Sequence, residues 1–201
     1  MFSSRELKCV CQSFDAETTG QEYFSKIISQ NENLASSPSF QAVTHIQLKS
    51  CESLDLVLDV SALPETEYAV TDVSFENVPT LKLQFDEVLP RSLKLVVEDS
   101  TTTTISGRLD GYNNVEMYFR QIRNENYFDS EVNFKDLYSR ANIRLLNFQD
   151  IGHITVENSL FQSLESLDLI HTRHCHHVSP AGDKTQVGCT KQDLFFDITS
   201  D

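Results

Sequence analysis

The densest group of potentially reactive side chains in this sequence lies near the C-terminus. It is the run His171-Thr172-Arg173-His174-Cys175-His176-His177. Imidazole and thiolate groups both bind zinc and copper, so these residues could hold a metal ion. Alternate residues of a strand face the same side, which would bring His171, Cys175 and His177 together. Cys189 follows in the sequence and could be the fourth ligand.

The same residues have two other interpretations. Cys175 and Cys189 could form a disulfide that closes the turn at Pro180-Ala181-Gly182-Asp183. Alternatively, the histidine-rich run could be an exposed polar loop with no special role. The spacing favours the disulfide and places the metal site last among the three. We therefore predict no metal ion and no cofactor.

All the cysteines lie towards the two ends of the chain. They are Cys9, Cys11, Cys51, Cys175 and Cys189. Each is a disulfide candidate, because terminal caps held by disulfides are typical of secreted solenoids. The odd number leaves one thiol unpaired, and in a reducing compartment none would pair. The placement favours an extracellular or cell-surface protein whose signal peptide lies outside this chain; a cytoplasmic location is the alternative.

The remaining titratable residues form no recognisable catalytic pattern. Asp55 and Asp59 are spaced to share one face of a strand or a helix, and paired carboxylates can do acid–base chemistry. Such a pair is far more often solvated on a surface. His45 lies on a predicted strand and is expected at the surface or at the edge of a coil, and His153 has no evident partner in the sequence. Nucleophile-elbow, phosphate-loop, dinucleotide and zinc-protease motifs are absent, so we predict that the protein is not an enzyme.

The charge of the chain narrows the choice of partner. The formal net charge is -14, which disfavours nucleic acid and anionic membrane surfaces. No run of apolar residues is long enough for a transmembrane helix, so we expect no membrane insertion. The remaining partner class is another protein, and the acidity permits one with a basic surface.

The elements that would position these residues follow a degenerate repeat of roughly 25 residues. Segments that begin at Val73, Met117 and Leu146 share the order apolar, polar or Tyr, Phe, variable, amide or acid, apolar. Related strands begin near residues 46, 95, 167 and 194. A unit of this size cannot bury its apolar face alone, so successive units are expected to stack into one continuous core.

Alternation of apolar and polar residues within each unit predicts strands rather than helices. We expect the chain to bend at Asn77-Val78-Pro79 and Asp150-Ile151-Gly152, and to continue into a second strand of each coil. Phe75, Phe119 and Phe148 occupy matched positions and are expected to stack inside. The predicted fold is mainly β, a parallel β-solenoid over residues 41–201.

Residues 1–40 differ from the repeats and are expected to form an N-terminal cap. Thr19-Gly20-Gln21-Glu22 has the spacing of a capping box, which predicts a short helix after it.

Two segments resemble extracellular leucine-rich repeats. Phe161-Gln162-Ser163-Leu164-Glu165-Ser166-Leu167-Asp168-Leu169 resembles the F-x-x-L-x-x-L-x-L stretch of that family, and Cys9-Val10-Cys11 resembles part of its cysteine cap. At the place of the family's ladder asparagine stand Val78, Ile122 and Ile151. The ladder is therefore absent, or it is shifted to the preceding residues Asn77, Gln121 and Asp150. This departure favours a related shape, a degenerate leucine-rich-repeat-like coil or a right-handed β-helix.

Such solenoids usually serve as binding surfaces or structural spacers, and the resemblance implies the same role here. We therefore predict a non-catalytic interaction or structural solenoid that presents an extracellular protein-binding surface. A polysaccharide-active β-helix enzyme and an intracellular repeat adaptor are the alternatives. The ends of a solenoid expose strand backbone, so self-association through them is also possible.

Overall fold

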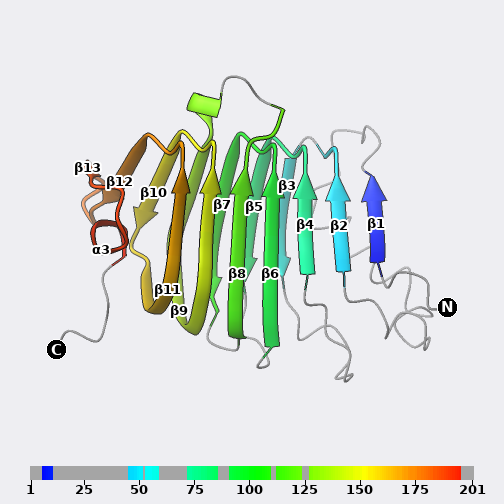
Figure 1. Cartoon of the computed structure of the whole chain (residues 1–201), viewed down its shortest axis with the longest axis horizontal. Helices are drawn as coiled ribbons and strands as arrows, with labels where there is room; N and C mark the ends of the chain where they lie inside the picture. The colour runs from blue at the N-terminus through cyan, green and yellow to red at the C-terminus, as the bar shows by residue number, and fades with distance from the viewer. Residues whose placement is uncertain are drawn as a thin grey trace.

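The computed structural model shows a parallel β-solenoid, in which the chain winds through stacked coils of two strands each (Figure 1). The structure describes residues 6–10, 45–51, 53–58, 72–85, 91–109, 112–123 and 127–195. The predicted N-terminal cap helix lies outside these residues. Strands dominate the described chain, and the mainly β prediction is confirmed.

One side of the solenoid is a parallel sheet that we call the front sheet. Its strands, in spatial order, are β1 (Glu6–Val10), β2 (His45–Lys49), β4 (Asp72–Glu76), β6 (Arg91–Glu98), β8 (Tyr112–Arg120), the second half of β9 (Glu131–Gln149) and β11 (Leu160–Ile170). Neighbours in this sheet come from consecutive coils, as the repeat predicts. β1 was not predicted, since the sequence placed this segment in the cap.

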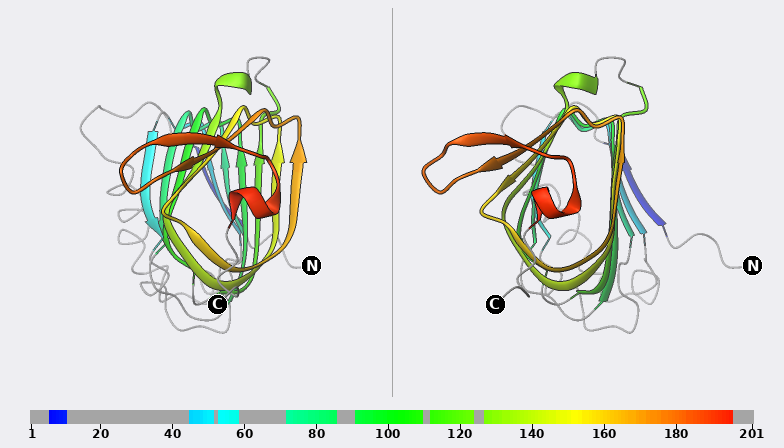
Figure 2. Two further views of the ribbon diagram at one scale, coloured as in Figure 1. Left: turned by 90° about the vertical axis from the view of Figure 1, so that its left-hand side faces the viewer. Right: turned by 60° about the vertical axis from the view of Figure 1, so that its left-hand side comes forward.

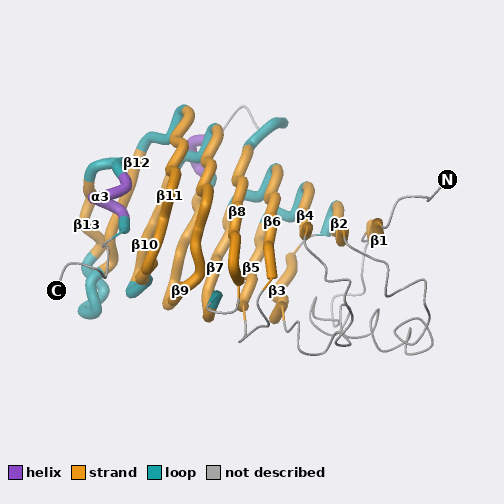
Figure 3. Tube along the Cα trace, turned by 60° about the horizontal axis from the view of Figure 1, so that its bottom comes forward, coloured by secondary structure: helices purple, strands orange, loops and turns teal. Residues whose placement is uncertain are grey.

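The opposite side is the rear sheet. Its parallel strands are β3 (Ser53–Leu58), β5 (Thr80–Phe85), β7 (Thr102–Arg108), the first half of β9, β10 (His153–Glu157) and β12 (His174–Val178). β13 (Lys184–Val187) then adds antiparallel to β12. β9 runs through both sheets and joins them into one continuous structure, which Figure 3 shows as a long bent tube.

The core fills the space between the two sheets because alternate residues of each strand point inward. In β5, for example, Leu81, Leu83 and Phe85 are buried, while Lys82 and Gln84 are exposed. The predicted aromatic positions are buried and lie in one column that runs across the coils. Their register runs Leu48, Phe75, Val97, Phe119, Phe148 and Leu169.

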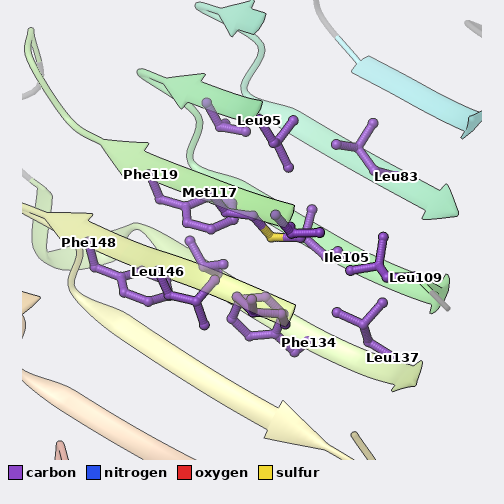
Figure 4. Packing of buried hydrophobic residues seen from close by; sticks show 14 of the residues in the cluster. Leu83, Leu95, Ile105, Leu109, Met117, Phe119, Phe134, Leu137, Leu146 and Phe148 are labelled. Carbon is purple, nitrogen blue, oxygen red and sulfur yellow. The ribbon is translucent and has the colours of Figure 1, made fainter. Parts of the chain in front are cut away.

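The matched phenylalanines meet directly where they occupy adjacent coils. The rings of Phe119 and Phe148 are stacked with centroids 5.2 Å apart (Figure 4). Val97 stands between Phe75 and Phe119 in the column, so Phe75 does not extend that stack.

Five front strands, β2, β4, β6, β9 and β11, end in a corner that has the left-handed backbone conformation. Ser50, Asn77, Asp99, Asp150 and His171 all have φ between 56° and 57°. Asn and Asp tolerate this conformation better than most residues, which explains why polar residues recur at the corner. The corner N–H donates to the next coil: Asn77 N to Glu98 O at 2.9 Å and Asp99 N to Arg120 O at 2.9 Å. The predicted bends at residues 77–79 and 150–152 are therefore present.

The coil that contains Ile122 departs from the predicted pattern. The pattern places Ile122 inside, like Val78 and Ile151, but its side chain is 63% exposed. Gln121 is buried instead, and its Nε2 donates to the carbonyl oxygen of Ser100. The chain leaves the coil here because the carboxylate of Asp99 accepts the N–H of Ile122 (2.7 Å) and of the next residue. The loop that follows ends with the 3-10 turn η2 (Tyr127–Asp129).

The C-terminal end is closed by the β12–β13 hairpin and by the short helix α3 (Lys191–Leu194). Figure 2 shows α3 across the opening between the two sheets. Leu194 and Phe195 are buried, and the ring of Phe195 lies 4.6 Å from that of Phe161. The prediction of a strand that begins near residue 194 is wrong at its start, because Leu194 is helical; residues 196–201 lie outside the described chain.

Candidate functional site

The structure joins Cys175 and Cys189 in a disulfide. Their Cα atoms lie 5.4 Å apart, and Cys175 is buried at the C-terminal end of the core. Cys51 is disulfide-bonded as well. A bonded sulfur is not a thiolate, so Cys175 and Cys189 do not offer metal ligands in this state.

The histidines of the candidate metal site point to different places. His171 stands at a corner with Nδ1 2.9 Å from Oδ1 of Asp150. His177 lies on the side that faces α3, where its Nε2 donates to the carbonyl oxygen of Asp193 at 2.6 Å. Within the part of the chain that the structure describes, no three His, Cys, Asp or Glu side chains are arranged to hold a metal ion.

The other candidate pair is not assembled into a described site. Asp55 lies in β3, where its backbone is in register with Lys82 of β5. Asp59 lies outside the described residues.

His153, for which the sequence shows no partner, belongs to a cluster of three imidazoles. His153 of β10 is in register with His174 of β12, and His176 follows two residues later on the same outer side. The ring centroid of His153 lies 5.1 Å from that of His174 and 5.7 Å from that of His176. The separation between His153 and His174 is close to one repeat, which was the signal that could have revealed this pair.

The surroundings of this histidine cluster lower the pKa of one of its members. Burial lowers the pKa of His176, and the positive charges of Lys184 and the neighbouring imidazoles act in the same direction. Its Nδ1 is buried without a hydrogen-bond partner. For Glu131, burial would raise the pKa, but hydrogen bonds from Thr155 (2.7 Å) and Lys184 (3.1 Å) outweigh it and lower the pKa.

The outer face of the front sheet carries a second group of functional side chains, which reach from coil to coil. Carboxylates on one strand meet cations on the next: Glu116 Oε1 lies 2.9 Å from Arg144 Nη1, and Glu76 Oε1 lies 2.7 Å from Lys49 Nζ. Each exposed pair contributes little to stability by itself. Together they fix the charge pattern of a flat surface.

Tyr118 lies on β8 in this sheet, and with Lys94, Glu116, Arg120 and Arg144 it forms what we call the Tyr118 patch. The Tyr118 hydroxyl donates to Glu116 Oε2 at 3.0 Å. Its ring centroid lies 5.0 Å from the guanidinium carbon of Arg120 and 5.6 Å from Lys94 Nζ, within reach of a cation–π interaction. Burial raises the pKa of Tyr118, and so does the bond to Glu116. Half-buried tyrosine beside arginine is typical of protein interfaces.

Comparisons of this chain with family models, with curated proteins and with solved structures found no match. None of the described helices has the length and apolar character needed to cross a membrane. The class of the protein therefore comes from its own geometry. It is a parallel β-solenoid with a disulfide at its C-terminal end.

Proposed function

We propose that this protein is a non-catalytic extracellular solenoid that binds another protein through the outer face of its front sheet. The observation that carries the proposal is the Tyr118 patch, which sits on strands held by neighbours on both sides. β8 is paired with β6 and with β9, so the backbone beneath Tyr118 is fixed before binding. A rigid support reduces the ordering cost of association.

The chemistry of the patch suits a protein partner. Tyr and Arg are enriched among the residues that carry most of the binding energy at interfaces. The acidic excess of the chain and the presence of Glu76, Glu98 and Glu116 on this face favour a partner with a basic rim. The disulfides support an extracellular location, because such bonds persist in oxidising compartments.

We also propose that the fold is nearer to the β-helix alternative than to a leucine-rich repeat. Each coil from β2 to β12 has strands on both sides, with a polar residue at the corner between them. Solenoids of this shape also include polysaccharide-active enzymes, so that function is the second candidate. The ion pairs argue against it, since Glu76 and Glu116 are each held by cations rather than poised as an acid and a base.

A paired screen separates the two functions. The oxidised protein would be immobilised and tested by surface plasmon resonance against a panel of secreted and cell-surface ectodomains. In parallel it would be incubated with a polysaccharide panel, with and without Ca²⁺, and the products would be assayed for new reducing ends. We expect saturable binding to at least one ectodomain and no polysaccharide turnover. Turnover, or the absence of any saturable protein binding, would contradict the proposal.

A further inference from the structure

The two sheets end differently at the C-terminal end of the solenoid. The rear sheet ends in β13, a strand of 4 residues that starts at Lys184 and belongs to a disulfide-closed hairpin. Short strands and lysines protect a sheet edge from further pairing. The front sheet ends in β11, which has 11 residues and pairs only with β9 among the described strands (Figure 2). The long edge is therefore the one without these protections.

The inward side chains of β11 show that this coil is incompletely covered. Leu146 and Phe148 of β9 are fully buried at 0% exposure, because a strand lies on each side of them. Leu167 and Leu169 occupy the same register positions on β11 and are only partly buried. A further strand beside β11 would bury Leu167 and Leu169 as fully as β11 itself buries the matching residues of β9.

The backbone of β11 has donors and acceptors directed to the open side. The carbonyl oxygen of Ile170 accepts from Asp150 N at 2.9 Å, so Ile170 directs its peptide groups towards β9. In a parallel sheet, the N–H and C=O groups of successive residues point alternately to the two sides of the strand. Because those of Ile170 point to β9, those of Leu167 and Leu169 point to the free edge.

The charges on the outer side of β11 indicate what would lie beside it. On the inner strands, carboxylates pair with arginine or lysine of an adjacent strand, as Glu116 does with Arg144. On β11, Glu165 accepts from Asn142 Nδ2 at 2.6 Å and Asp168 from Asn147 Nδ2 at 3.5 Å. None of the ion pairs among the described residues includes Glu165 or Asp168.

We propose that the free edge of β11 binds an extended segment of a partner protein, which adds to the front sheet as one more strand. Its apolar residues would cover Leu167 and Leu169, and alternate lysine or arginine residues would lie opposite Glu165 and Asp168. This proposal rests on the proposed function, since it names the kind of segment that the solenoid recognises. A second copy paired through β11 is disfavoured, because it would bring the same carboxylates together.

The probe is a short synthetic peptide in which valine and lysine alternate, labelled for fluorescence anisotropy and titrated with the full, oxidised chain. We expect saturable binding, and none for a peptide that alternates valine and glutamate. Glu165→Lys/Asp168→Lys should weaken the binding at least about tenfold. The matched control is Asp129→Lys/Asp183→Lys, which makes the same charge change at exposed positions away from β11 and should leave binding unchanged. Melting curves confirm that both variants fold.

Four results would overturn the proposal. The first is no binding of the valine–lysine peptide, and the second is an equal loss in both charge variants. The third is a dimer in sedimentation that dissociates in Glu165→Lys/Asp168→Lys, which would assign the edge to a second copy. The fourth is binding that appears only in Ile198→Ser, which would assign the edge to this chain's own C-terminal segment. Binding of an ectodomain through the Tyr118 patch would remain in each case, so failure of this proposal differs from failure of the proposed function.

Discussion

Replacing Phe119 with alanine should lower the free energy of unfolding by about 4–5 kcal/mol. Phe119 lies near the middle of the core and is 1% exposed. Its ring stacks on Phe148 at 5.2 Å and meets Phe134 edge-on at 6.0 Å. The substitution therefore removes contacts to two coils at once.

The magnitude follows from these contacts. Burial of one aromatic side chain contributes about 2–3 kcal/mol. Each aromatic pair adds about 0.5–1.5 kcal/mol beyond burial. The rings of Phe134 and Phe148 are held by paired strands and cannot easily collapse into the space, so the cost should lie in the upper part of the range for such substitutions.

The assay is urea unfolding of the oxidised protein, followed by circular dichroism. The matched control is Tyr138→Ala, because Tyr138 is also an aromatic residue of a strand but is 37% exposed. We expect the control to cost less than about 1 kcal/mol. Equal unfolding midpoints for Phe119→Ala and the unaltered chain would refute the stacked-coil account of the core.

Three further predictions concern the C-terminal half. Because burial lowers the pKa of His176 below its ordinary value of 6.5, the unfolded chain takes up the proton first. The free energy of unfolding should have its full value above about pH 6.5 and should decrease as the pH drops below it. Between about pH 7.5 and about pH 5, the free energy of unfolding measured in urea should decrease less for His176→Gln than for the unaltered chain. An equal decrease in the two proteins would contradict this. Gly152→Ala should cost about 1–3 kcal/mol, since its Cβ would lie 2.1 Å from the carbonyl oxygen of Phe128; an unchanged melting temperature would refute the contact. Cys175→Ala/Cys189→Ala opens a loop with a sequence separation of 14 and should cost about 3 kcal/mol, measured by melting under oxidising conditions; a melting temperature equal to that of the unaltered chain would show that the bond is not formed.

Much of the coil could be predicted because its pattern is local. Strand alternation around Phe75 and Phe148, and the polar corners at Asn77 and Asp150, follow from the period of a strand and the conformations that Asn and Asp tolerate. The position of Ile122 could not be predicted in this way. Its outward turn depends on the carboxylate of Asp99 in the preceding coil.

The functional residues were harder to predict because they meet only across coils. His153 and His174 are far apart in the sequence and become neighbours through the exact register of β10 and β12. The Tyr118 patch likewise needs the register of β6, β8 and β9 to bring Lys94 and Arg144 to the same tyrosine. The sequence left open whether Cys175 takes part in a metal site or in a disulfide. The answer depends on the antiparallel pairing of β13 with β12, which brings Cys189 back beside Cys175.

The most direct test of the account is the dissociation constant of Tyr118→Ala for an ectodomain that binds the unaltered protein, measured beside Tyr138→Ala. Tyr118 is central to the proposed binding face, so its loss should cost at least about 2 kcal/mol, roughly a thirtyfold weaker binding. The control should bind as the unaltered protein does, since Tyr138 contacts Asn158 at a different corner of the solenoid. Equal dissociation constants for the two variants would contradict the claim that the front sheet is the binding surface.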